Sequence, residues 1–492
     1  MFLNLADLFS DMVSDSSRRV LTVLTLALIN VAAVMNLSQL SILAQTGLAA
    51  ISFLAIAGIA FFIPTALASA ELASAYPKKG GIYAWVKEAF GKNWGFFAIW
   101  LQWVENVFWY PTVLSFAVAT IAFIIDPHLA TNTLYTFITI LFITWTVTLA
   151  NFRGMKLSGK ISSIGVTVGM MFPAALIIFL GILWLLLGKG SEIEFTTSAL
   201  LPDFGNINNL VLLLGAMLGL CGIEMSAVHV NSVKDPKKNF PKAIFLSAGL
   251  ILGIFALGAL AIAVVVPQKQ ILLSAGIMDA FSAFFSAFGI AWALPIIALF
   301  VALGSIGTIS TWIIGPSKGL LATAEDGTLP PFFQRTNSQG VPTNLLLMQA
   351  GIITFLVVVY LFMPSINSFY WMLTALTAQL YLIMYVLMFA ALIKLRYSQP
   401  NIKRPYSLPG GKVGMWLIAG LGILASVSGI LLGFIPPSQI NTGSGMFFQL
   451  FIVGAIVTTG IVALIILRLK KPSWVPKSAG VKPKSRTIRK NR

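Results

Sequence analysis

The chain has 492 residues, of which 58% are hydrophobic and only 10% are charged, with a formal net charge of +17. Soluble globular proteins carry about 25% charged residues, so this composition excludes a soluble enzyme. Apolar runs recur from residue 20 to residue 470, which excludes a single anchor on a soluble domain. The runs are continuous, whereas apolar and polar residues alternate in a transmembrane β-barrel. The sequence therefore predicts an all-α polytopic membrane protein.

A helix needs about 20 mostly apolar residues to cross a bilayer. Twelve such runs are present, at 20–44, 48–72, 93–124, 133–151, 160–188, 208–232, 242–266, 280–314, 343–363, 368–395, 412–434 and 446–469. Outside them we expect an N-terminal segment at 1–19 and a basic tail at 470–492. We expect this tail to be disordered. Contact of its basic residues with anionic lipid headgroups is the alternative.

The first and sixth spans contain interruptions. The first, LTLALINVAAVMNLSQLSILAQTG, has a cluster of polar side chains at its middle, formed by Asn36, Ser38, Gln39 and Ser41. The sixth, LLLGAMLGLCGIEMSAVHVNSV, has Gly215, Gly219 and Gly222 beside a lone Glu224. A broken helix at membrane depth persists only where it lines a cavity or is buried in protein. Close helix packing at the glycines is the alternative explanation.

Interrupted helices at corresponding positions of two five-helix halves are typical of an inverted-repeat transporter. We therefore expect one repeat at 20–188, a second at 208–395, and two accessory helices at 412–469. The predicted fold is thus twelve transmembrane helices in a 5+5 arrangement with broken helices 1 and 6.

The third span carries one polar face. Gln102, Glu105, Asn106 and Trp109 fall at i, i+3, i+4 and i+7, so they lie on one side of the helix. Ionisable residues inside a bilayer are candidate functional residues, which singles out Glu105 and Glu224.

Three other residues have competing interpretations. Glu71, near the inner end of the second span, is expected to pair with a nearby lysine or a backbone end. His229 has hydrogen-bonded packing as its favoured interpretation and a proton relay as the alternative. Trp312 lies among Ser, Thr and Gly in the eighth span, where an interfacial position is the alternative to a site role.

Lysine and arginine set the orientation, because they concentrate on the cytoplasmic side of membrane proteins. With a cytoplasmic N-terminus, the outer loops hold only Lys189 and Lys269 of the 32 Lys and Arg residues. This pattern predicts that both termini are cytoplasmic. The single cysteine and the compact loops favour a bacterial inner membrane over a eukaryotic plasma membrane. It also explains the positive charge without a nucleic-acid partner.

Four stretches resemble the amino acid–polyamine–organocation superfamily, and within it the glutamate–GABA antiporter family. They are AELASAYPKKGGIYAWVKEAFGKNWGFFA (70–98), GIEMSAVHVNSVKDPKKNFPKAI (222–244), WIIGPSKGLLATAEDGTLPPFF (312–333) and RPYSLPGGK (404–412). The resemblance implies an inverted-repeat fold with alternating access and one central site for an amino acid, without a cofactor or a metal.

The resemblance also implies roles for individual residues. The substrate carboxylate would meet the backbone around Leu37–Ser41 with the Ser38 and Ser41 hydroxyls, and the amine would meet carbonyls near Val34 and near Leu218 or Gly219. Glu224 matches an acid used in pH-dependent transport, and Trp312 an aromatic that packs against the substrate. The full set of expected substrate-binding residues is Asn36, Leu37, Ser38, Gln39, Ser41, Glu105, Asn106, Leu218, Gly219, Gly222 and Trp312, with Glu224 and His229 for proton coupling.

The chain departs from the family pattern in three places. MNLSQLS replaces the Gly-x-Gly pattern of many relatives at the first break, Leu218 replaces a gating aromatic, and the tail shows no sign of a folded plug.

Coupling and substrate leave alternatives open. A carboxyl in a low-dielectric helix break favours its protonated form, so we expect Glu224 to link transport to protons. A sodium-coupled or uniport permease for amino acids or polyamines is the alternative, with sodium bound by carbonyls and by hydroxyls such as Ser310 and Thr311. With two mid-membrane acids and no mid-membrane Lys or Arg, a neutral or cationic amine suits the cavity better than an anionic side chain. A channel and an integral membrane enzyme are the remote alternatives.

Overall fold

The computed structural model of the chain describes residues 22–78, 80–153, 165, 167–202, 204–226, 233, 235–362 and 365–475. In this part of the chain the elements are helices joined by loops. Eleven helical segments are long and apolar enough to cross a membrane, and the bent pair α2 (Val23–Val34) and α3 (Ser38–Ala44) makes a twelfth. The prediction of an all-α polytopic membrane protein with twelve spans is confirmed.

The first half of the chain supplies five spans and one short helix. After α2 and α3 come η1 (Gly47–Ala49), α4 (Ala50–Ala57), the π-helical turn η2 (Gly58–Phe62) and α5 (Ile63–Ala75), which together form the second span. The short helix α6 (Ile82–Phe90) precedes the long α7 (Lys92–Ile125). The turn η3 (Pro127–Thr131), α8 (Thr133–Asn151), η4 (Thr167–Met171) and α10 (Phe172–Leu186) complete this half.

The second half begins after the loop helix α11 (Thr197–Leu200). Its first span consists of α12 (Ile207–Leu210), α13 (Leu213–Gly219) and α14 (Ile223–Ser226). There follow α15 (Pro236–Val265), η6 (Gln268–Gln270), α16 (Gly276–Ala287), η7 (Ala291–Ala293), α17 (Leu294–Glu325), η8 (Pro331–Gln334), α18 (Thr343–Tyr360) and α19 (Ile366–Ser398). The helices α20 (Gly411–Leu432) and α21 (Gly445–Leu469) and the turn η9 (Pro472–Trp474) close the described chain.

The breaks in the first and sixth spans lie where the sequence predicts them. Between α2 and α3 the axis bends by 74°. The Asn36 side chain caps α3, because its Oδ1 accepts hydrogen bonds from the Ser38 amide at 3.1 Å and the Ser38 hydroxyl at 3.0 Å. Between α13 and α14, Gly222 has φ +101°, a conformation that residues with a Cβ rarely adopt.

The eighth span is shifted from its predicted place. The sequence predicts 280–314, but residues 276–287 form the separate helix α16 and the span runs from Ala291 to Glu325. Gly289 adopts φ +70° after α16, so the chain turns there. Pro316 does not end α17, which continues for more than two turns beyond it.

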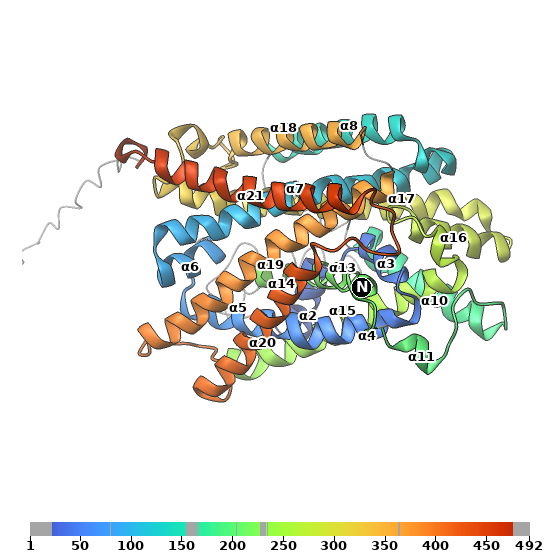
Figure 1. Ribbon diagram of the computed structural model, residues 1–492, viewed down its shortest axis with the longest axis horizontal. Helices are drawn as coiled ribbons and strands as arrows, with labels where there is room; N and C mark the ends of the chain where they lie inside the picture. Colours follow the sequence, from blue (N-terminus) through green and yellow to red (C-terminus); the bar gives the residue numbers. More distant parts are fainter. Residues whose placement is uncertain are drawn as a thin grey trace, which may run out of the picture.

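The helix α7 passes through the middle of the bundle and packs along α17 and α19. In Figure 1 the longest helices follow the long axis of the molecule, and α8 lies beside α18 at one edge. The first broken span packs against α15, and α13 packs against α3 and α19. The two breaks therefore face one another in the interior, next to α7.

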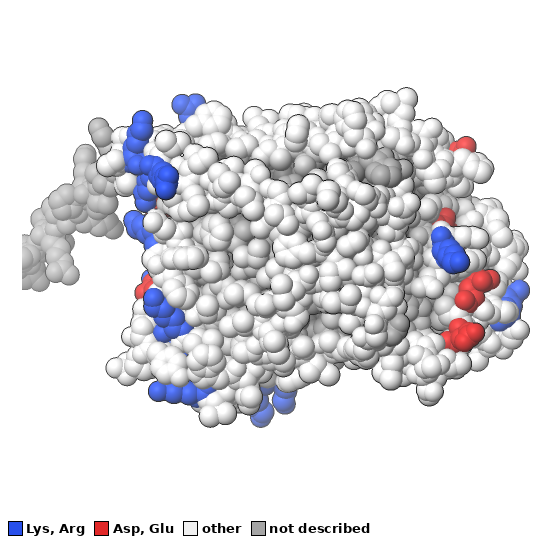
Figure 2. All heavy atoms as spheres, viewed as in Figure 1, with Lys and Arg blue, Asp and Glu red and all other residues white. Residues whose placement is uncertain are grey.

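The surface shows how the bundle is embedded. Figure 2 shows a broad uncharged band between two charged ends, with Lys and Arg gathered at one end and Asp and Glu prominent at the other. Large apolar side chains on α20 and α21 face outward, among them Leu417, Leu424, Leu450 and Leu464. Such a band suits lipid, in which apolar side chains need no burial in protein.

Candidate functional site

A cavity lies where the two helix breaks meet α7 and α17. Its lining residues come from the two broken spans, α7, α17 and α19. They are Ala33, Val34, Met35, Asn36, Gln39, Glu105, Asn106, Trp109, Leu218, Gly219, Cys221, Thr308, Trp312 and Tyr381. The cavity is therefore built from segments far apart in the sequence, at the place where the helical backbone is interrupted.

The polar face of α7 forms one wall of this cavity. Glu105 and Asn106 are each only 2% exposed and line the cavity, as does Trp109 one turn further along. Glu105 Oε1 and Asn106 Oδ1 have no hydrogen-bond partner among the described residues, and neither does Gln39 Oε1 on α3. Buried acceptors without donors are costly, so this wall is suited to receive a donor-bearing ligand.

Two tryptophans form an aromatic side of the cavity. Trp109 of α7 and Trp312 of α17 lie with their ring centroids 5.9 Å apart. A Cβ added at Gly222 would lie 3.1 Å from the Trp312 ring, so the sixth-span break and this indole fit closely together. The contact explains why a glycine suits this position on grounds of space as well as of backbone conformation.

Glu224 lies next to the cavity and is surrounded by hydrogen-bond donors. Its carboxylate accepts hydrogen bonds from the Tyr381 hydroxyl at 2.7 Å, the Tyr385 hydroxyl at 2.5 Å and the Gln102 amide at 3.1 Å. The Gly222 amide donates to the Tyr385 hydroxyl at 3.0 Å. This chain of contacts couples the sixth-span break to α7 and α19 through one carboxylate.

A second and larger hollow opens on the other side of Glu224. It has a volume of about 450 Å³, and Gln102 and Glu224 line it together with Gly80, Trp85, Lys318 and Glu325. We call it the vestibule. Gln102 and Glu224 thus line the vestibule, and Glu224 is hydrogen-bonded to Tyr381 of the cavity lining, whereas Glu105 and Asn106 line the cavity.

The residues expected to bind the substrate carboxylate at the first break do not all line the cavity. Asn36 and Gln39 line the cavity, but Leu37, Ser38 and Ser41 are buried and absent from its described lining. The Ser38 hydroxyl bonds to Asn36, and the Ser41 hydroxyl lies against Gly276 of α16. The two serine side chains therefore do not belong to the described cavity lining.

Of the other expected residues, Glu105, Asn106, Leu218, Gly219 and Trp312 line the cavity. Gly222 packs against the lining residue Trp312, and Glu224 lines the vestibule. His229 lies outside the described residues. The expected sodium ligand Ser310 is buried in α17, where its hydroxyl lies 3.4 Å from Asn151 Oδ1, and the Thr311 side chain is outside the description.

Sequence reasoning missed Tyr381 and Tyr385. They lie four residues apart on α19 and therefore on one face, with stacked rings 4.9 Å apart. That spacing within an apolar helix was an available signal, because a buried tyrosine hydroxyl usually has a hydrogen-bond partner. Thr308 on α17 was missed as well.

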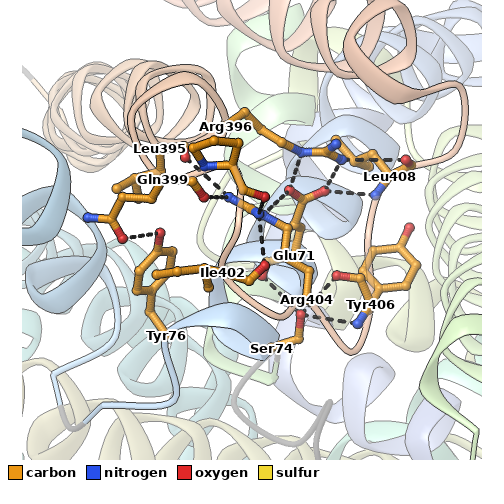
Figure 3. A network of polar contacts seen from close by, with 11 residues as sticks. Glu71, Ser74, Tyr76, Leu395, Arg396, Gln399, Ile402, Arg404, Tyr406 and Leu408 are labelled. Carbon is orange, nitrogen blue, oxygen red and sulfur yellow. Dashed lines mark hydrogen bonds and ion pairs between the residues drawn. The ribbon is translucent and has the colours of Figure 1, made fainter.

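Glu71 anchors a buried ion network at one end of the bundle (Figure 3). Its carboxylate receives two hydrogen bonds from Arg396 at 2.5 and 2.6 Å and one from the Leu408 amide at 2.7 Å, with Arg404 at 3.3 Å. The expectation of a backbone partner is met, but the cationic partners are arginines distant in sequence rather than a nearby lysine. The network ties α5 to the end of α19 and to the segment that leads into α20.

A second link joins α6 to α17 at the same end. Lys87 and the Tyr83 hydroxyl both bond to Asp326, which follows the last residue of α17. Burial would raise the pKa of Asp326, but these two hydrogen bonds outweigh it and hold that pKa below its usual value. Burial and the bond to Asp326 raise the pKa of Tyr83, so this hydroxyl stays protonated.

The described residues contain no group of three or more His, Cys, Asp or Glu placed to hold a metal ion. What they contain is a membrane-embedded cavity bounded by two broken helices, with a hydrogen-bonded carboxylate on the path to one end. This arrangement is typical of secondary transporters.

The chain belongs to the amino acid permease family, whose model matches residues 19–457. It is a secondary amino acid transporter. An uncharacterised transporter of Legionella pneumophila is 45% identical over 90% of this chain and 95% of its own length. A glutamate/gamma-aminobutyrate antiporter of Lactococcus lactis is 33% identical over 83% of this chain and 82% of its own length. A probable agmatine/putrescine antiporter of Lactococcus lactis is 27% identical over 83% and 86%.

Proposed function

We propose that the protein is a proton-linked antiporter of amino acids that works by alternating access, with the cavity as its substrate site. One observation carries this proposal: the cavity lies at the junction of two helix breaks, and Glu224, which lines the vestibule, is hydrogen-bonded to Tyr381 of the cavity lining. A site that can be closed from one end while it opens to the other is the requirement for alternating access. The antiporter names of two relatives support exchange.

Glu224 is the proposed proton site. Three donors from α7 and α19 converge on its carboxylate. Protonation would remove the charge that holds these donors, and the contacts between the sixth-span break and its neighbours would weaken. Proton binding would thereby be linked to the side on which the cavity opens. His229 lies five residues further along the chain and remains a secondary candidate for the same relay.

Within the cavity we assign the substrate ammonium to the acceptor side. The Glu105 carboxylate and the backbone carbonyls near Val34 and Leu218 are the proposed partners of the amine. The carboxylate group is assigned to the first break, where Asn36 and Gln39 line the cavity.

We propose that the basic end is cytoplasmic. Lys and Arg gather at that end (Figure 2), and the vestibule residue Lys318 lies toward the end of α17 that carries Asp326. By the positive-inside tendency this end faces the cytoplasm, so the vestibule would open inward. Both termini would then be cytoplasmic in a plasma membrane of the bacterial inner-membrane type.

Counterflow tests the proposed function. Proteoliposomes are loaded with a mixture of unlabelled amino acids or left empty, and uptake of each labelled amino acid is followed. We expect uptake that requires internal substrate. Equal uptake into empty vesicles would contradict antiport and indicate a uniporter or an ion-coupled permease.

A pair of glycine variants tests whether the cavity is the transport site. Gly219 lines the cavity, and its added Cβ would already contact Gln39 at 3.4 Å. Gly219→Val therefore presses on Gln39, which lines the cavity, and should abolish exchange. Gly253→Val on α15 is the matched control, because no atom lies within 4 Å of an added Cβ there. If both variants exchange equally well, the cavity is not the transport site.

A further inference from the structure

The cavity contains a carboxylate that no other side chain of the described residues neutralises. Glu105 is 2% exposed, and its Oε1 has no hydrogen-bond partner among the described residues. Glu224, in contrast, is 3% exposed but accepts three hydrogen bonds. Two acids on neighbouring helices thus have opposite surroundings, and only the one in the cavity lacks donors.

We propose that this cavity selects organic cations, either diamines or amino acids with a cationic side chain, over amino acids with an acidic side chain, and that Glu105 is the residue that sets this preference. The inference rests on the proposed function, since it names the substrate class of the same cavity. An ammonium group would bring both the missing donors and the opposite charge to Glu105.

The rest of the lining also favours a cation. Among its described residues there is no lysine or arginine. Asn106 Oδ1 and Gln39 Oε1 add two more buried acceptors without partners. The amide groups of these side chains can rotate to serve one substrate carboxylate, but nothing in the described lining offsets the charge of a second one.

The two tryptophans of the cavity also favour a cationic ligand. Trp109 and Trp312 both line the cavity, and indole faces attract cations more strongly than other aromatic rings do. The first break contributes few free donors, because Asn36 already occupies the amide and hydroxyl of Ser38. A ligand with two ammonium groups therefore matches the hydrogen-bond acceptors of the cavity lining better than a ligand with two carboxylates does.

Ligand-dependent thermal stabilisation of the purified full-length protein measures this preference without transport. Putrescine, lysine, glutamine and glutamate are titrated at about pH 7.5, where all free carboxylates and amines are charged. For the wild type we expect putrescine and lysine to act at concentrations at least about tenfold below glutamate. Glutamate acting at the same or lower concentrations would overturn the proposal.

Three variants assign the preference to Glu105. Glu105→Gln keeps the shape but removes the charge, and should weaken the two cations at least about tenfold while changing glutamine much less. Glu105→Asp keeps the charge and should retain the preference for cations. Glu88→Gln, in α6 outside the cavity, is the control for loss of an acid and should behave as wild type. An unchanged ratio of lysine to glutamate in Glu105→Gln would refute the role of Glu105.

The same ligands used in counterflow separate this inference from the proposed function. Cations that stabilise the wild type but are not exchanged would contradict antiport and support the cation site. Exchange of glutamate by a protein that cations do not stabilise would support antiport and refute the cation site. If Glu105→Gln fails to fold, the wild-type ratio and Glu105→Asp still decide the question.

Discussion

The buried carboxylate of Glu71 gives a direct prediction for stability. Glu71 is 1% exposed, and its two arginine partners are 15% and 8% exposed for Arg396 and Arg404. Glu71→Gln leaves two guanidinium groups buried without a counter-charge. Removing one partner of a buried ion pair costs about 3–5 kcal/mol, because the remaining charge stays out of water. The Lys78–Glu88 pair at the same end is 65% and 31% exposed, and such pairs contribute about 0–1 kcal/mol.

Thermal unfolding of the detergent-purified variants measures the contrast. An unfolding entropy of about 2.1 cal/mol/K per residue gives a chain of 492 residues about 1 °C in Tm per kcal/mol, so Glu71→Gln should lower the Tm by about 3–5 °C. Glu88→Gln makes the same chemical change at the exposed pair and should shift the Tm by no more than about 2 °C. Equal effects of the two variants, or a wild-type Tm for Glu71→Gln, would refute the reasoning that burial makes this network essential.

Three further variants have distinct expected outcomes. Gly222→Ala places a Cβ at φ +101° and 3.1 Å from Trp312, so the exchange rate should fall at least about tenfold. Gly253→Ala is the control and should exchange at the wild-type rate. Equal rates for the two variants would contradict the tight fit between Gly222 and Trp312. Burial raises the pKa of Asp279 from 3.8 to about 7, so its charge destabilises the fold increasingly as the pH rises through that range. Asp279→Asn should therefore stabilise more at about pH 7.5 than at about pH 5.5, by about 2 kcal/mol, and a pH-independent effect would contradict this. The pKa of Asp326 is lowered below 3.8, so its stabilising bonds persist above that pH, and Asp326→Asn should lower the Tm equally at both pH values.

Most of the fold could be predicted from the sequence, because membrane spans are long and continuous. The two breaks were also visible, since Asn36 to Ser41 and the glycines before Glu224 interrupt apolar runs. The eighth span was misplaced because the apolar residues of α16 adjoin it, and only the turn at Gly289 separates the two. Apolar composition alone does not distinguish a span from a neighbouring apolar helix.

The site was predictable where polarity marks a helix face and not where it depends on tertiary contacts. The stripe on α7 predicted a shared polar face for Glu105 and Asn106, and both side chains line the cavity. The serines of the first break were expected there too, but the Asn36 cap turns the Ser38 hydroxyl inward and Ser41 packs on α16. Orientation around a break depends on side-chain hydrogen bonds that composition does not reveal.

The central claim is that Glu224 links protons to exchange. The direct measurement is counterflow in proteoliposomes at about pH 5.5 and 7.5 for the wild type and Glu224→Gln, a range over which a carboxyl in a low-dielectric site can titrate. Asp279→Asn serves as the control, because burial raises the pKa of that acid to about 7 and it lies outside the cavity lining. The account predicts that exchange by the wild type and by Asp279→Asn depends on pH, whereas Glu224→Gln exchanges at one rate at both values. A Glu224→Gln variant that keeps the wild-type pH dependence would contradict it.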